Sequence, residues 1–277
     1  MRFVPLFAWA RLRHRPARWL LVALGVAVAT VLPVLAENSA AIVAAQAVRY
    51  GVAQLDPGQR SLIASAYGQR LTPAQVGRLD TEVRKELAPL AATPPRAELL
   101  YGRLATGANT TYSLAAADDL ASAVRITEGR APRSCTPTRC EVVVTGTGTP
   151  ALSPDLGLVI VGRAVRTDPL LLSGTFDPGA GVPVLLADGV VPATQLASLE
   201  QFPRTYGWVT PIDLDRVQHL GVSAYLARSA QATEDLLGFY PGINLDAPDD
   251  VLRAQDARAR QSARRFALLG GSATALL

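Results

Sequence analysis

The sequence predicts an α+β extracytoplasmic domain that follows an N-terminal transmembrane helix and precedes the start of a second one. Three observations carry this prediction: a long uncharged apolar run at Trp19–Ala36, one clear amphipathic helix after Thr72, and a later series of short strand-like runs. A helix followed by many strands and scattered short helices is typical of α+β proteins. The predicted segments are a basic cytoplasmic tail over 1–18, transmembrane helix 1 over 19–37, the α+β domain over 38–262, and the truncated start of transmembrane helix 2 over 263–277.

The apolar run, WLLVALGVAVATVLPVLA, has the composition and length of a membrane helix. Ten of its 18 residues are Leu or Val and none is charged. Each Leu or Val adds roughly 0.3 to 0.6 kcal/mol of favourable insertion free energy. At about 1.5 Å per residue the run approaches the roughly 30 Å hydrocarbon core of a bilayer. The alternative is a cleaved signal peptide, because Val34 and Ala36 before Glu37 are the small residues that a signal peptidase needs.

The orientation follows from the charges around this run. Residues 1–36 contain no Asp or Glu, and five arginines precede Trp19, namely Arg2, Arg11, Arg13, Arg15 and Arg18. By the positive-inside rule the N-terminus stays in the cytoplasm. A retained helix and a cleaved signal peptide both place residues 38–260 outside the cytoplasm.

The overall charge of +4 does not indicate a nucleic-acid partner. Five of the 27 basic residues lie in the tail, which leaves 22 basic against 23 acidic residues in 37–277. The external part is therefore nearly neutral and carries no electrostatic footprint for phosphate backbones.

Two cysteines, Cys135 and Cys140, predict a local disulfide. The four residues between them, Thr-Pro-Thr-Arg, form a turn that lets the two Cα atoms approach. In an oxidising compartment such a pair forms a bridge, which in so short a loop adds about 2 kcal/mol of stability and fixes the loop. A zinc site needs more ligands than His14 and His219 can supply, so no metal is expected.

The first soluble elements are two helices and a strand. Residues 41–56 are Ala-rich and end at the turn Asp56-Pro57-Gly58, and Ser61–Tyr67 is a strand candidate. The clearest helix has Thr72 as N-cap and Pro73 at its first position. Its apolar residues recur at spacings of three and four, at Val76, Leu79, Val83, Leu87 and Leu90.

After Pro95 the pattern changes to strands between turns. The expected strands are Ala97–Leu104, Ala123–Thr127, Glu141–Thr145, Leu158–Val165, Leu170–Ser173, Val182–Leu186 and Tyr206–Thr210. The expected short helices are Ala115–Ala121, Pro192–Gln201 and Ala230–Leu237.

A long terminal helix is expected from Asp246 or Pro248 onward, because no Gly or Pro interrupts the run before Gly270. It leads into the twelve apolar or small residues Phe266–Leu277, too few to span a bilayer. Two interpretations remain open: a terminal helix buried on its own domain, or a second membrane helix that is cut off. Small residues at 270–273 would suit packing against another membrane helix.

The sequence carries no catalytic motif. It contains no G-x-S-x-G, no H-E-x-x-H and no G-x-x-x-x-G-K-[ST], so no catalytic residue, cofactor site or metal site is expected. The acid pairs Asp118-Asp119 and Asp249-Asp250 stand where a helix N-terminus would favour acids. His219 is expected on a surface or half-buried helix position.

Three stretches together resemble the FtsX/MacB-type permease family of ABC transporters in its actinobacterial form. They are ARLRHRPARWLLVALGVAVA at 10–29, the series EGRAPRSCTPTRCEVVV, LGLVIVGRAV and LLLSGTFDP within 128–178, and SARRFALLGG from Ser262. The resemblance covers essentially the whole chain and lies in the order of the motifs, each of which is structural. Family members have at least four membrane helices, so the resemblance implies that this chain is the N-terminal portion of a permease or a truncated gene product.

The resemblance implies a MacB-like core domain that moves when a separate cytoplasmic ATPase binds and hydrolyses ATP. The chain itself would be no enzyme and hold no cofactor; its partners would be the lipid bilayer, the ATP-binding subunit, and further permease helices or a second permease copy. The sequence leaves the transported substrate open between a lipid, a lipoprotein and a peptide. A purely mechanical signal to a cell-wall enzyme is the remaining alternative. The other hypothesis is a single-pass membrane-anchored extracytoplasmic binding module.

Overall fold

The computed structural model describes residues 25, 42–106, 110–148, 150–175 and 182–274. The chain divides into two compact units, one of residues 1–50 with 254–277 and one of residues 51–253. The predicted membrane helix Trp19–Ala36 lies outside the described residues except for Gly25. Within the described part of the chain, no helix combines the length and the apolar character that crossing a membrane requires.

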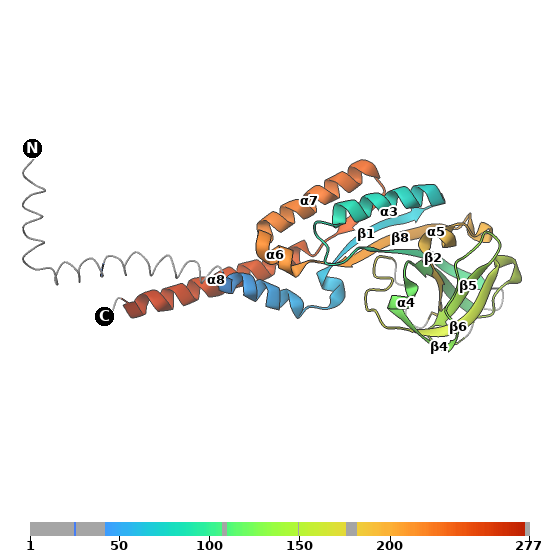
Figure 1. The fold of residues 1–277 in the computed structure, drawn as a ribbon, viewed down its shortest axis with the longest axis horizontal. Coiled ribbons are helices and arrows are strands. Elements are labelled where there is room, and N and C mark those ends of the chain that lie inside the picture. The colour runs from blue at the N-terminus through green and yellow to red at the C-terminus, as the bar shows by residue number, and fades with distance from the viewer. Residues whose placement is uncertain (1–24, 26–41, 107–109, 149, 176–181, 275–277) are drawn as a thin grey trace, which may run out of the picture. The chain divides into compact units, whose positions relative to one another are not determined.

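The unit of residues 51–253 is built on one mixed nine-stranded sheet, which confirms the α+β class (Figure 1). Across the sheet the strands follow the order β4-β6-β5-β7-β3-β2-β8-β1-β9. Their bounds are β1 Ser61–Gln69, β2 Arg96–Thr106, β3 Thr110–Ala117, β4 Val124–Gly129, β5 Cys140–Thr145, β6 Leu158–Arg166, β7 Val184–Asp188, β8 Arg204–Pro211 and β9 Ile243–Asp246.

Two parallel pairings lie among the antiparallel ones. β3 pairs with β7 in parallel, with Ala115 opposite Leu186, and β5 pairs with β6 in parallel, with Glu141 opposite Val159. Parallel pairs are normally buried on both faces. β3 and β7 follow this rule: Ala115, Leu185 and Leu186 are fully buried.

Two helices, α3 Pro73–Leu87 and α7 Val222–Phe239, lie over one face of the β1 and β8 end of the sheet (Figure 1). α3 begins as its sequence predicts, because Thr72 and Gln75 form a capping box. Its apolar face is buried on the sheet, where the indole Nε1 of the fully buried Trp208 donates to Asp80 at 2.9 Å. The other short elements of this unit are α4 Leu120–Ala123, α5 Val190–Thr194, α6 Leu214–Leu220, and the 3-10 turns η1 Pro57–Arg60, η2 Pro154–Leu156 and η3 Ala197–Leu199.

At the other end of the sheet, a second cluster of apolar side chains fills the space enclosed by β4, β5, β6 and β7. It includes Leu120 from α4, Val143, Leu171 and Leu186, each at most 2% exposed. Gly162 in β6 permits the close approach of the antiparallel neighbour β4, because a Cβ there would lie 2.5 Å from the Glu128 carbonyl oxygen.

Several sequence predictions were wrong. The helix expected at Ala115–Ala121 is strand β3 through Ala117, followed by α4, because pairing with β2 and β7 outweighs the helix propensity of three alanines. The strand expected at Leu170–Ser173 is a turn in which Leu172 has φ +67°. The helix expected at Pro192–Gln201 is split into α5 and η3.

The remaining elements predicted among the described residues are present in the structure. One helix is longer than predicted, and a further helix and a further strand were not predicted. α7 extends well beyond the expected Ala230–Leu237, and neither α6 nor β9 was predicted. The Ala-rich helix runs over 42–53, close to its expected range. The long terminal helix expected from Asp246 or Pro248 is confirmed as α8, which runs without a break over Asp249–Thr274.

Candidate ligand-binding cleft

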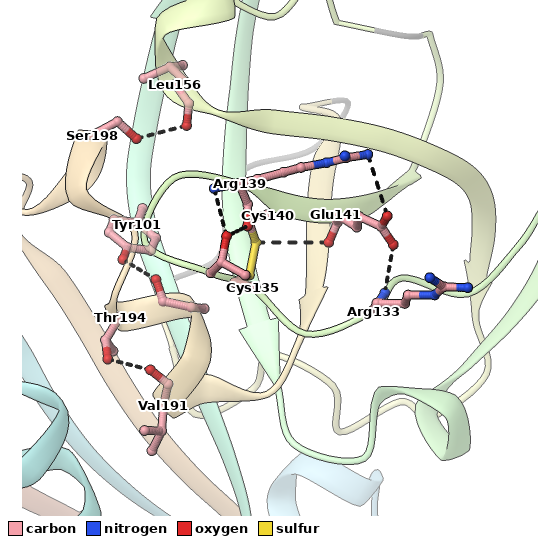
Figure 2. Close-up of a disulfide and its surroundings, with 12 residues drawn as sticks. Tyr101, Arg133, Cys135, Arg139, Cys140, Glu141, Leu156, Val191, Thr194 and Ser198 are labelled. Atoms are coloured by element: carbon pink, nitrogen blue, oxygen red, sulfur yellow. Dashed lines mark hydrogen bonds and ion pairs between the residues drawn. A yellow bond between two sulfur atoms is a disulfide. The ribbon is translucent and has the colours of Figure 1, made fainter.

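Cys135 and Cys140 form a disulfide, as the sequence predicts, and their Cα atoms lie 4.1 Å apart (Figure 2). The loop between them is a tight turn: the backbone N–H of Thr136 donates to the Arg139 carbonyl at 2.7 Å, and the Thr136 hydroxyl accepts the Arg139 N–H at 3.1 Å. Cys140 starts β5 and its N–H donates to the Gly157 carbonyl at 2.8 Å. The bridge therefore fixes a projecting loop at the start of a buried strand.

Arginines surround the carboxylate of Glu141, the residue after the bridge. Arg130 binds it through both terminal nitrogens at 2.7 Å, and the backbone N–H of Arg133 donates to it at 3.1 Å. The Arg130 hydrogen bonds lower the pKa of Glu141 to about 2. The loop is thus clamped on its outer side as well as by the disulfide.

A cleft of about 560 Å³ lies on the inner side of this loop. Four parts of the fold form its walls: the turn from β1 into α3, the disulfide loop, the end of α5 with η3, and the start of β8. The lining residues are Arg70, Leu71, Thr72, Pro73, Pro137, Thr194, Gln195, Leu196, Ala197, Glu200, Gln201 and Arg204.

Backbone and side-chain hydrogen bonds hold the walls together. The N–H of Ala197 donates to the Pro137 carbonyl at 2.9 Å, which joins η3 to the disulfide loop. The hydroxyl of Ser198 donates to the Leu156 carbonyl at 2.8 Å (Figure 2). The wall made by η3 is therefore attached to both η2 and the loop that the disulfide closes.

Arg204 is a cleft-lining residue that is only 3% exposed. Its Nη1 donates to the Thr194 carbonyl at 3.0 Å, and its Nη2 donates to the carbonyls of Leu199 and Glu200 at 3.3 and 3.4 Å. The guanidinium lies over the ring of Tyr101, 5.2 Å from the centroid. Across the described residues no carboxylate forms an ion pair with it, and its Nε has no hydrogen-bond partner.

The rim of the cleft carries a second cation. Arg70 is exposed, and its Nη1 donates to the Gln201 side-chain oxygen at 3.3 Å. Thr72 and Pro73 place the N-terminus of the 15-residue helix α3 at the same rim, which adds partial positive charge. Glu200 is the one acidic residue among the lining residues, and it is exposed.

The acids and the histidine considered from the sequence lie elsewhere in the fold. Asp118 accepts the N–H of Val190 at 2.9 Å, and burial raises its pKa. Asp119 is at the N-cap position of α4, Asp249 and Asp250 open α8, and His219 is exposed in the last turn of α6. None of them lines the cleft. Within the described ranges, no group of three or more His, Cys, Asp or Glu could hold a metal ion.

The sequence indicated the disulfide but not the cleft. Arg204 opens an ordinary strand, and only the fold shows that it lies over Tyr101, 103 positions earlier. No known protein-family model matches the chain, and no curated protein matches it.

Proposed function

We propose that this chain is a permease subunit of an ABC transporter, or the N-terminal portion of one, with an extracytoplasmic domain coupled mechanically to a separate cytoplasmic ATPase. The observation that carries the proposal is α8. This single helix begins within the sheet-bearing unit of residues 51–253 and continues without a break through Thr274. A continuous helix transmits displacement along its axis better than a jointed linker.

The start of α8 is anchored to the sheet-bearing unit. Leu252 is fully buried, and the carboxylate of Asp249 accepts a hydrogen bond from the buried Ser229 of α7 at 3.4 Å. The first turn of α8 is therefore packed on the sheet-bearing unit, which supports a coupling role for the helix.

Ion pairs one turn apart stiffen the helix beyond that anchor. Arg253 lies 3.6 Å from Asp249, and Arg260 lies 2.9 Å from Asp256. Such pairs stabilise a helix by a few tenths of a kcal/mol each. These ion pairs favour a continuous helix over a flexible linker in this segment.

The disulfide supports the extracytoplasmic location of the domain. Bridges persist in oxidising compartments and are rare in the cytosol. Both cysteines are buried, and the bridge closes the exposed loop 136–139 that lies between them. The bilayer, an ATP-binding subunit, and further permease helices or a second permease copy complete the proposed assembly, which has no nucleic acid partner.

The test is coupling to an ATPase. The purified chain alone should neither bind nor hydrolyse ATP, because it has no phosphate-binding loop. With a co-purifying nucleotide-binding subunit, ATPase activity should appear and should fall when two glycines replace Arg260 and Gln261 in the middle of α8. A matched pair of alanines, which keeps the helix, should leave the activity unchanged. Intrinsic ATPase activity of the chain alone would refute the assignment.

A second candidate is a single-pass membrane-anchored extracytoplasmic binding module, and the cleft beside the disulfide favours it. Cysteine crosslinking separates the two candidates. The permease predicts crosslinks between position 25 or 28 and positions 270–273 in a membrane-embedded sample. The anchored module predicts no such crosslinks and protection of Leu268, Leu269 and Leu276 within the external domain.

A further inference from the structure

We infer that the cleft between the disulfide loop and the N-terminus of α3 binds a small organic anion, whose carboxylate or phosphate group is held by Arg70 and by the positive potential of Arg204. This inference goes beyond the transport role and does not depend on it.

The buried guanidinium of Arg204 carries an uncompensated positive charge. Moving a charged group from water to a protein interior is costly unless the group is paired. Carbonyl oxygens satisfy its terminal nitrogens, but no carboxylate of the described residues neutralises it and its Nε is unpartnered. A buried guanidinium without a carboxylate partner favours binding of an anion in the cleft that it lines.

The side chain of Arg204 is held in place and cannot move away to find an anionic partner. Three carbonyls fix its terminal nitrogens, and the ring of Tyr101 supports its flat face. Tyr101 is itself fixed, because its hydroxyl donates to the Ala193 carbonyl at 3.0 Å. The positive charge is therefore preorganised at the floor of the cleft, which lowers the cost of binding.

The other charged groups of the cleft also favour an anionic ligand. Arg70 is exposed at the rim and able to contact a ligand directly, and the α3 N-terminus adds positive potential beside it. Glu200 is the one opposing charge among the lining residues, against the two arginines. The lining therefore carries an excess of positive charge.

The size and walls of the cleft indicate an organic ligand rather than a bare ion. A volume of about 560 Å³ lies within the range of small-molecule sites. Leu71 and Leu196 are buried apolar wall residues, and Pro73 and Pro137 add rigid apolar surface. A ligand with one anionic group and an apolar body matches this combination.

The test uses the full chain in detergent and measures binding by titration calorimetry and by the shift of the thermal unfolding midpoint. The probes are benzoate, inorganic phosphate and the uncharged benzamide. Benzoate or phosphate should bind with a Kd of about 1 mM or tighter, and benzamide should not bind. Binding of benzoate alone assigns a carboxylate ligand, and binding of phosphate alone assigns a phosphorylated one.

Arg70→Gln should weaken anion binding about tenfold, since it removes one charge-assisted contact from an exposed position. Arg228→Gln on α7, an exposed arginine outside the cleft, is the matched control and should bind as the wild type does. Arg204→Gln should abolish binding, but Arg204 is buried and this change also disturbs folding. The decisive variant is therefore Arg70→Gln, at an exposed position. The inference is wrong if neither anion binds, if benzamide binds as tightly as benzoate, or if Arg70→Gln has no effect.

Discussion

The carboxylate of Glu98 on β2 accepts the backbone N–H of Leu172 at 2.8 Å, although the two residues are 74 positions apart in the chain. Its other oxygen accepts the Gly174 N–H at 3.2 Å. Neighbouring Arg96 binds Asp168 at 2.6 Å, at the start of the same turn. One fully buried carboxyl group and one arginine therefore hold the whole turn after β6 on the sheet.

Glu98 should make stability fall as pH rises. Burial raises its pKa to about 7, against 4.5 for an ordinary glutamate, so between these values the native state binds a proton that the unfolded state has released. The contribution of Glu98 to the free energy of unfolding is therefore fully present below about pH 4.5. It is lost as the pH rises through 7, which lowers the free energy of unfolding by up to about 3 kcal/mol. Urea unfolding at pH 5 and pH 8 measures the effect.

Glu98→Gln is the control for this prediction. The variant should be less stable than the wild type at pH 5, because its amide NH₂ faces a backbone N–H where an acceptor is needed. Its decline between pH 5 and pH 8 should be smaller than that of the wild type. Equal pH slopes in the two proteins would show that Glu98 does not titrate in this range.

Asp80→Ala should destabilise the protein by about 1 to 3 kcal/mol, because it leaves the buried indole N–H of Trp208 without an acceptor. It also removes the ion pair with Arg84 at 2.8 Å. Chemical denaturation monitored by tryptophan fluorescence gives the value. Glu234→Ala on the exposed side of α7 is the matched control and should change stability by less than about 0.5 kcal/mol. Equal effects of the two changes would contradict the role of the Trp208 contact.

Thiol alkylation of the native protein without reductant should label neither Cys135 nor Cys140, because they are bridged. Replacing both by serine should lower stability by about 2 kcal/mol at most, since the closed loop is short. Ready labelling of both thiols in protein isolated from membranes would argue against an oxidising compartment.

The orientation can be tested with reporter fusions. A reporter that is active only outside the cytoplasm should be active after Ser61 and inactive after Leu12, because the arginines before Trp19 stay in the cytoplasm. The opposite pattern would overturn the proposed topology. A mature protein that starts at Glu37 would identify the N-terminal run as a cleaved signal peptide.

Local signals in the sequence were sufficient where the physical cause is local. Thr72 and Pro73 mark the start of α3, and the β-branched run after Cys140 marks β5, because capping and strand propensity act over a few residues. Ala115 and Leu172 were misassigned because distant partners decide their conformation: Leu186 pairs with the first, and Glu98 accepts the N–H of the second.

The candidate cleft also depends on contacts between residues that are distant in the sequence. Its loop could be predicted from the spacing of two cysteines, but its cation at position 204 could not. The environment of Arg204 is made by the carbonyls of α5 and η3 and by the ring of Tyr101. None of these contacts leaves a pattern in the sequence.

The position of β1 in the sheet has a consequence for the order in which the domain folds. β1 is made early, yet its two neighbours are β8 and β9, so its ladder is completed only by Ile243–Asp246. At a synthesis rate of about 5 to 20 residues per second, the first strand waits roughly 10 to 35 s for these partners. A chain that is translocated as it is made would release the apolar residues of β1 on the far side of the membrane long before β9 arrives. Pairing of β1 is therefore a late event, whereas β2 to β7 are contiguous in the sheet and are complete once Asp188 is made. The unpaired first strand is the segment most in need of protection from aggregation until β8 and β9 follow.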